Sequence, residues 1–141
     1  MRQSTTTSLL LLLLALPLAP ACSKETPPAP PAAGGAQGKA ALPDRDPALA
    51  RRLVGEGAVL LDVRTTEEYG ERHLDGAVNI PVGDLGGRLA EVEKLTGGDK
   101  NKPIVVYCQT GGRSARAKTA LVEAGYTQVT NVGGIDDWDR K

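Results

Sequence analysis

The sequence predicts an α/β fold with a mainly parallel, five-stranded sheet and helices on both faces. Short continuous apolar runs, such as residues 58–63 and 103–107, alternate along the chain with segments of helical spacing. Runs that are apolar at every position are typical of parallel strands buried on both faces. The length of residues 43–141 suits one small domain.

The first half of this domain contains a helix, a strand, a helical turn and a second strand. Asp46-Pro47 favours a helix start, because aspartate caps a helix and proline is tolerated at its first position. Gly55 and Gly57 end that helix. The next elements are a strand at residues 58–63, a helical turn at 67–69 and a strand at 76–81 that ends in proline.

The second half repeats the alternation with longer helices. Apolar residues recur at helical spacing from Leu85 to Leu95, and Gly97-Gly98 closes that helix. The remaining elements are a strand at 103–107, a helix at 114–124, a strand at 126–132 and, after two glycines, a short helical segment with Trp138.

The segment from Cys108 to Ser114 gives the strongest indication of chemistry. Cys108 follows a buried strand and precedes a helix, so backbone amides and the positive end of the helix dipole favour an anion there. Gly111 and Gly112 let the loop amides turn inward, and Arg113 adds a cation with a fork of donors. We therefore interpret Cys108 as a reactive thiol; the alternative is a buried structural cysteine.

Residues 1–21 have the form of a secretory signal. Arg2 supplies a positive charge, and the apolar run from Leu9 to Leu16 is too short to span a membrane comfortably. The pattern Ala19-x-Ala21 suits an ordinary signal peptidase, which leaves Cys22 as the first residue. The cysteine at this boundary also resembles a bacterial lipoprotein signal, with Ala19 where leucine is usual. We favour lipidation of Cys22.

Residues 22–42 are rich in proline, alanine and glycine and predict a tether. This organisation predicts a cell-envelope protein that faces the periplasm and is anchored to a membrane by lipid alone; whether that membrane is the inner or the outer one stays open. Cys108 would then be a lone thiol in an oxidising compartment, which favours catalysis or a persulfide over packing.

The composition argues against other classes of partner. The chain has 17 basic and 17 acidic residues, and no basic stripe or aromatic platform indicates nucleic acid. No cluster of residues has the spacing of metal ligands. We expect a monomer that binds small molecules.

Four sequence segments form a recognisable series. They are LDVR at 61–64 with EEY at 67–69, HLDGAVNIP at 73–81, VYCQTGGRS at 106–114 and GGIxxW at 133–138. In this order they resemble the motifs of the single-domain rhodaneses, a family of sulfurtransferases. The resemblance covers about residues 46–138, so it spans nearly the whole domain.

This resemblance implies sulfur transfer through a persulfide on Cys108, without a metal or organic cofactor. The thiolate would take sulfur from thiosulfate or from a persulfide or polysulfide, and cyanide, a thiol or a protein cysteine would remove it. Arg113 would stabilise the anion. The loop carries one cation fewer than loops dedicated to thiosulfate often do, so we expect modest thiosulfate activity. The expected substrate-binding residues of the loop are Gln109, Thr110, Gly111 and Gly112.

Neighbouring side chains have alternative roles. Arg64 is a candidate substrate-binding residue at the pocket rim, and the alternative is a structural ion pair with Asp62. Arg113 stands at a helix start, where the dipole disfavours a cation, so we expect an anion nearby. By the resemblance His73 has a packing role rather than a catalytic one. Tyr107 is expected in the core.

Two rival functions stay open. Related phosphatases and arsenate reductases also hold an oxyanion in a cysteine–arginine loop, but their loop is one residue longer than the six residues from Cys108 to Arg113. The second rival is a non-catalytic rhodanese-like module for protein binding or thiol redox sensing. Retention of the cysteine, the glycines and the arginine favours an enzyme.

Overall fold

The structure is a computed structural model that describes residues 41–141. The predicted signal, Cys22 and nearly all of the predicted tether lie outside the described residues. Within residues 41–141, no helix combines the length and the apolar character that crossing a membrane requires.

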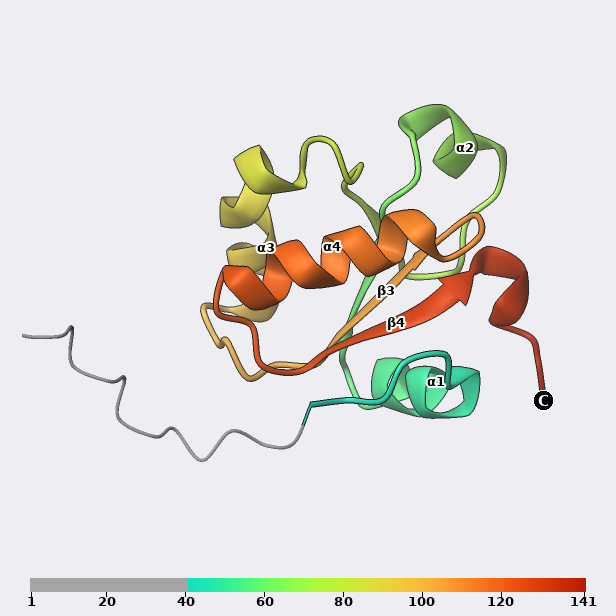
Figure 1. Cartoon of the computed structure of the whole chain (residues 1–141), viewed down its shortest axis with the longest axis horizontal. Coiled ribbons are helices and arrows are strands. Elements are labelled where there is room, and N and C mark those ends of the chain that lie inside the picture. Colours follow the sequence, from blue (N-terminus) through green and yellow to red (C-terminus); the bar gives the residue numbers. More distant parts are fainter. Residues whose placement is uncertain (1–40) are drawn as a thin grey trace, which may run out of the picture. The chain divides into compact units, whose positions relative to one another are not determined.

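Four parallel strands form the sheet, in the order β2-β1-β3-β4 (Figure 1). The central strands β1 and β3 are buried at every position, as their largely apolar sequences predict, and the burial of β1 includes the charged residue Asp62. The prediction of a parallel α/β sheet is therefore confirmed. The strands are β1 at Val59–Asp62, β2 at Val78–Asn79, β3 at Ile104–Cys108 and β4 at Val129–Gly134.

The prediction of five strands is wrong for the described residues, which form four. Residues 43–45 lie beside the outer edge of β4 without forming a ladder. The amide of Arg45 donates to the carbonyl of Asn131 at 2.8 Å, but Pro43 has no amide hydrogen to donate. Arg45 also has a φ of 58°, which turns the chain away from the extended path of a strand.

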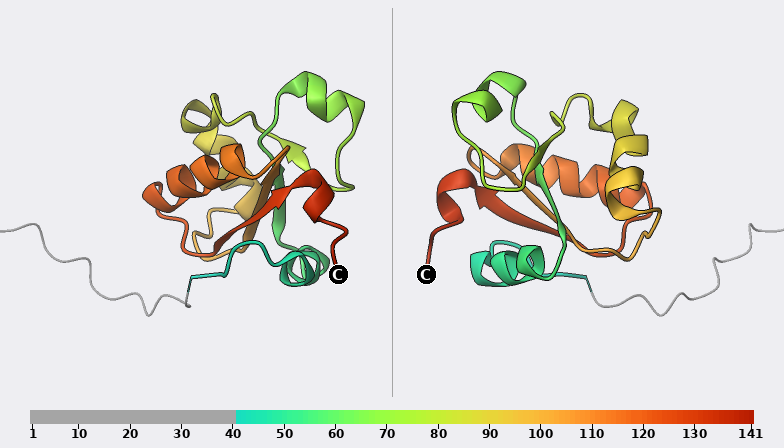
Figure 2. Two further views of the ribbon diagram at one scale, coloured as in Figure 1. Left: turned by 45° about the vertical axis from the view of Figure 1, so that its right-hand side comes forward. Right: turned by 180° about the vertical axis from the view of Figure 1, so that it is seen from behind.

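One face of the sheet is covered by α1, which spans Pro47–Gly55 (Figures 1 and 2). Asp46 caps this helix by accepting a hydrogen bond from the amide of Leu49 at 2.8 Å, as the sequence predicts. Ala50 and Leu53 of α1 share an apolar cluster with residues of the sheet such as Val105.

The opposite face is covered by η1 at Leu85–Arg88, α3 at Leu89–Thr96 and α4 at Gly112–Glu123. Val92 and Leu121 pack there against residues such as Leu61 and Val106. Side chains alternate between the two faces along a strand, so Cys108 lies on this face with Val106, and Tyr107 lies on the other.

Several elements differ from their predicted bounds. The helix predicted from Leu85 starts as a 3-10 turn, in which Gly86 and Gly87 are poor helix formers. The strand predicted at 126–132 is shifted to 129–134, and the strand predicted at 76–81 shrinks to two residues. The remaining helices are α2 at Thr66–Glu71 and η2 at Ile135–Asp137.

The carboxyl ends of β1 and β3 meet at one edge of the sheet, where α2 and η2 also lie (Figure 1). Asp62 pairs in register with Tyr107, so the loops that follow β1 and β3 are neighbours. Binding sites in open α/β sheets form at this edge. The structure thus brings residues 62–64, after β1, beside the loop that begins at Cys108.

Candidate active site

The sulfur of Cys108 lies between the end of β3 and the start of α4. The residue is fully buried. The amide of Gly111 donates to Cys108 Sγ at 3.0 Å, and Ser114 Oγ lies 3.4 Å from the same sulfur. The helix begins at Gly112, two residues earlier than predicted, so its amino-terminal amides lie close to the sulfur.

These donors change the acidity of the thiol. Burial raises the pKa of Cys108, because it disfavours the charged form. The Ser114 hydroxyl and the backbone amides of Ser114, Gly111 and Thr110 outweigh burial and lower the pKa of Cys108 below its ordinary value. The site therefore favours a thiolate, the nucleophilic form of cysteine.

The hydroxyl of Ser114 has three acceptors within reach. Besides Cys108 Sγ, it lies 3.0 Å from the carbonyl oxygen of Gly111 and 3.3 Å from that of Gly133. A hydroxyl carries one proton, so it donates to one strong acceptor at a time. A thiolate attracts this proton more strongly than a thiol does, so the bond to sulfur strengthens when Cys108 ionises.

Glycines allow the cysteine loop to touch the end of β4. A Cβ built on Gly134 would lie 2.6 Å from the carbonyl oxygen of Gln109, and one on Gly111 would lie 3.3 Å from the Cα of Gly133. Gly111 and Gly133 also have φ values of 101° and 110°, in the region that side chains disfavour. Gly133 and Gly134, which begin the last of the four matching segments, thus form part of the wall of the site.

Arg113 is held by Glu68, a residue that the sequence analysis did not assign to the site. Its two terminal nitrogens donate to the two carboxylate oxygens of Glu68 at 2.5 and 2.7 Å. The expected anion near Arg113 is therefore a carboxylate of α2. The signal in the sequence was the Thr65-x-x-Glu68 pattern of a capping box, which the structure contains.

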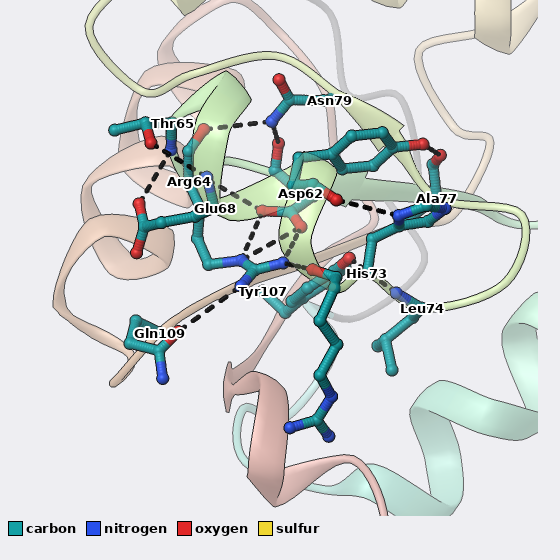
Figure 3. A network of polar contacts seen from close by, with 12 residues as sticks. Asp62, Arg64, Thr65, Glu68, His73, Leu74, Ala77, Asn79, Tyr107 and Gln109 are labelled. Carbon is teal, nitrogen blue, oxygen red and sulfur yellow. Dashed lines mark hydrogen bonds and ion pairs between the residues drawn. The ribbon is translucent and has the colours of Figure 1, made fainter.

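The ion pair of Arg64 and Asp62 is buried beside the loop (Figure 3). Arg64 donates to both carboxylate oxygens of Asp62, at 3.0 Å and 2.6 Å, and to the carbonyl of Arg72. A further nitrogen reaches Gln109 Oε1 at 3.4 Å. The side chain amide of Asn79 donates to the carbonyls of Asp62 and Arg64 and ties the turn together.

This placement speaks for the structural alternative at Arg64. Only 3% of the residue is exposed, and its guanidinium is occupied by Asp62, Arg72 and Gln109. It has no open face for a substrate, so its contribution is to hold the side chain of Gln109. Gln109 and Thr110 are both exposed on the surface of the loop.

The other residues considered as candidates lie apart from the sulfur or in the core. His73 is exposed, stacks on Tyr69 at a ring distance of 4.1 Å and hydrogen-bonds its carbonyl. Tyr107 is fully buried, and its hydroxyl accepts from the amide of Leu74. Among residues 41–141, no three histidine, cysteine or carboxylate side chains are grouped to hold a metal ion.

A sequence model described as the rhodanese-like domain matches residues 46–141. The chain is 43% identical over 77 residues to thiosulfate sulfurtransferase PspE of Escherichia coli (strain K12), which is 55% of this chain and 70% of that protein. It is 39% identical over 99 residues to the chloroplastic thiosulfate sulfurtransferase 16 of Arabidopsis thaliana, covering 64% of this chain and 81% of that protein.

Solved structures share the fold of this chain. The human single-domain sulfurtransferase TSTD1 aligns with a TM-score of 0.56 at 29% identity, over 74% of this chain and 96% of that one. A rhodanese with anions from E. coli aligns with a TM-score of 0.51 at 41% identity, over 57% of this chain and 89% of that one.

Replacing Ser114 by alanine tests the donor set around the sulfur. Ser114→Ala removes one hydrogen bond to the thiolate, so we expect the pKa of Cys108 to rise and the thiol to react severalfold more slowly at neutral pH. Ultraviolet absorbance of the thiolate, taken as the difference from Cys108→Ser across a pH titration, measures the shift. Thr119→Ala, on the exposed side of the same helix, is the control. An unchanged titration midpoint in Ser114→Ala would show that the amides alone set the pKa.

Glu68→Gln tests the ion pair with Arg113. The hydrogen bonds from Arg113 and from the amide of Thr65 lower the pKa of Glu68 from 4.5 to about 2. A carboxyl with a lowered pKa stabilises the fold fully above about pH 4.5, and that contribution is lost as the pH falls towards 2. We expect Glu68→Gln to cost on the order of 1 kcal/mol at neutral pH.

Urea unfolding at a series of pH values measures this effect. The free energy of unfolding of the parent should fall towards that of Glu68→Gln as the pH drops below about 4.5. Glu71→Gln, which removes an exposed carboxylate at the end of the same helix, is the matched control. A constant difference between parent and Glu68→Gln down to about pH 2.5 would contradict the assignment of the lowered pKa.

Proposed function

Because the chain belongs to the rhodanese-like domain family, we propose that it transfers sulfane sulfur through a persulfide on Cys108. The observation that carries the proposal is the convergence of the Ser114 hydroxyl and three backbone amides on a single buried sulfur at the start of a helix. Thiolate and persulfide are both anions, so the same donors serve both states. Two relatives bearing the name thiosulfate sulfurtransferase support the reaction class.

The first half-reaction loads the cysteine. The Cys108 thiolate attacks the outer sulfur of thiosulfate, the bond between the two sulfurs of thiosulfate breaks, and its electron pair leaves with sulfite. A persulfide or polysulfide donor would react in the same way and release a thiolate or a shorter polysulfide. Because Cys108 is fully buried, contact with a donor requires a local displacement of the loop.

The second half-reaction unloads the cysteine. Cyanide, a small thiol or a protein cysteine attacks the outer sulfur, and the electron pair of the broken bond returns to Cys108 as thiolate. The two steps share one intermediate and release the first product before the acceptor reacts, so ping-pong kinetics follow. In this proposal the Cys108 thiolate, the backbone amides of the loop and the Ser114 hydroxyl supply this chemistry without a cofactor.

Arg113 acts on the sulfur from a distance in this proposal. Its guanidinium is occupied by Glu68, and its charge still interacts with that of Cys108. The pair with Glu68 fixes the first turn of α4 against α2, and that turn carries Ser114, one of the donors to the sulfur. Direct anion stabilisation falls to the amides and to Ser114.

The rival functions receive less support. The loop from Cys108 to Arg113 has six residues, one fewer than the phosphatase-type loop, and its wall at Gly134 leaves no space for a Cβ. A module that only binds a partner would not require a set of donors that lowers the pKa of the cysteine. A thiol redox sensor would use the same lowered pKa, so the sulfur-transfer test below separates it from the enzyme.

We extend the proposal to the cell envelope. The signal-like residues 1–21, Cys22 at their boundary and the tether at 22–42 support a lipid-anchored domain that faces the periplasm. Lipidation leaves Cys108 as the single free thiol of the chain, which prevents an internal disulfide from competing with the persulfide.

Cys108→Ser tests the sulfur transfer. Mixed with thiosulfate, the parent protein should gain the mass of one sulfur atom, and cyanide should remove that sulfur as thiocyanate. Cys108→Ser should gain no sulfur and should lower transfer to the uncatalysed rate, because a serine hydroxyl cannot form the persulfide. Cys22→Ser is the control and should load like the parent. Equal sulfur transfer by Cys108→Ser and the parent would refute the proposed function.

Metabolic labelling with a fatty acid tests the lipid anchor. Expressed with its signal in a bacterial host, the full chain should incorporate the label, and the mature amino-terminal peptide should begin with acylated Cys22. Cys22→Ser should lose the label, whereas Cys108→Ser should retain it. A mature peptide that begins with unmodified Cys22 would instead assign the signal to an ordinary peptidase.

A further inference from the structure

A cavity of about 310 Å³ lies directly beside the cysteine loop. One side of it is formed by the active-site residues Gln109, Thr110 and Gly134. It is also lined by Arg45, from the segment before α1, and by Arg140, from the carboxyl end of the chain. The cavity therefore joins the reaction site to parts of the chain outside the family's loop motif.

Most charges around this cavity are already paired. Asp137 binds Arg140 at 3.0 Å, and Asp136 binds Arg72 at 2.8 Å. Two further arginines around the cysteine loop are paired as well, Arg64 with Asp62 and Arg113 with Glu68. Each of these guanidinium groups has its charge balanced by a carboxylate.

Arg45 differs from these arginines. Within residues 41–141 its side chain has neither an ion pair nor a hydrogen bond, and the residue is exposed. An arginine with all of its donors open presents a planar fork that matches the oxygens of a sulfonate or phosphate. Among the charged residues that line the cavity, Arg45 is thus the one without an ion pair within residues 41–141.

The guanidinium of Arg45 lies against the loop that holds the sulfur. A Cβ built on Gly111 would be 3.2 Å from a terminal nitrogen of Arg45, and the amide of Gly111 donates to Cys108 Sγ at 3.0 Å. An anion bound by Arg45 would therefore lie next to the residue that stabilises the thiolate.

The backbone of Arg45 is held in a costly conformation. Among residues 41–141, Arg45 is the only non-glycine residue with a positive φ, and that angle is 58°. Its amide is bound to the carbonyl of Asn131, the Asn131 amide donates to Asp44 on one side of it, and Asp46 on the other side caps α1. Such strain persists where the surroundings impose it, and it concentrates at functional sites.

We propose that Arg45 binds the anionic end of the sulfur donor, and that this residue selects donors with a sulfonate group such as thiosulfate. The inference rests on the proposed function. The fork of Arg45 holds the sulfonate oxygens, the outer sulfur faces Cys108, and the sulfite that leaves with the electron pair stays within reach of the same cation. Arg45 thereby supplies, from outside the loop, the positive charge that Gln109 and Thr110 lack.

Arg45→Gln provides the test, with persulfide formation on the full chain followed by rapid mixing and mass spectrometry. The thiosulfate concentration for half-maximal loading should rise on the order of tenfold, as expected for loss of a charge-assisted bidentate contact, with little change in the maximal rate. The rate at which 2-mercaptoethanol, an uncharged thiol, removes sulfur from the persulfide should be the same in Arg45→Gln as in the parent. Arg45→Lys, which keeps the charge but not the fork, should recover part of the loss.

Arg116→Gln is the matched control, because Arg116 is exposed on α4, lies outside the cavity and has no ion pair within residues 41–141. As a second measurement, thiosulfate should shift the amide resonances of Gly111 and Gly134 in Cys108→Ser, and adding Arg45→Gln should abolish the shifts. Unchanged loading in Arg45→Gln, or an equal loss in Arg116→Gln, would overturn this inference and leave the proposed function intact. Absence of any persulfide on the parent would overturn both.

Discussion

The site depends on a close backbone approach between the cysteine loop and the end of β4. The pairing of β3 with β4 shifts by one residue, so that Val106 faces Asn131 but Tyr107 faces Gly133. This shift places Gly133 and Gly134 beside Cys108 and the loop, where a Cβ on Gly134 would meet the carbonyl of Gln109 at 2.6 Å. The inward curl of the loop, which directs the Gly111 amide at the sulfur, is possible only because this wall is made of backbone alone.

Around this contact, the ion pairs stabilise the fold rather than the thiolate. The Asp62–Arg64 pair fixes the turn after β1, and the Glu68–Arg113 pair fixes the first turn of α4. The sulfur itself is stabilised by neutral donors, which keep it nucleophilic while lowering its pKa. Arg45 adds a cation without an ion pair within residues 41–141, on a segment whose backbone is anchored to β4.

Local features of the sequence predicted a large part of this structure. The apolar runs located the buried strands β1 and β3, Asp46-Pro47 located the start of α1, and the strand–Cys108–helix order located the nucleophile. The missed features depend on contacts between distant residues. Glu68 is 45 positions from Arg113 in the sequence, and its local pattern indicates only a helix cap. The structure contains that cap in addition to the ion pair. The count of five strands failed because the sequence located only four strand segments, and the described residues form those four without a fifth.

The sequence by itself determined the fold class, the position of the reactive cysteine and the family resemblance, because these follow from patterns within a few neighbouring residues. For Arg64 it left two roles open, substrate binding and a structural ion pair with Asp62. Only the tertiary structure decided which of these charged groups form ion pairs. Arg64 is buried in a pair with Asp62, and Arg113 is paired with Glu68. Arg45 lies beside Gly111 without an ion pair within residues 41–141. Ion pairing depends on distances of a few ångströms between side chains, and those distances are set by how helices and strands pack rather than by their order along the chain.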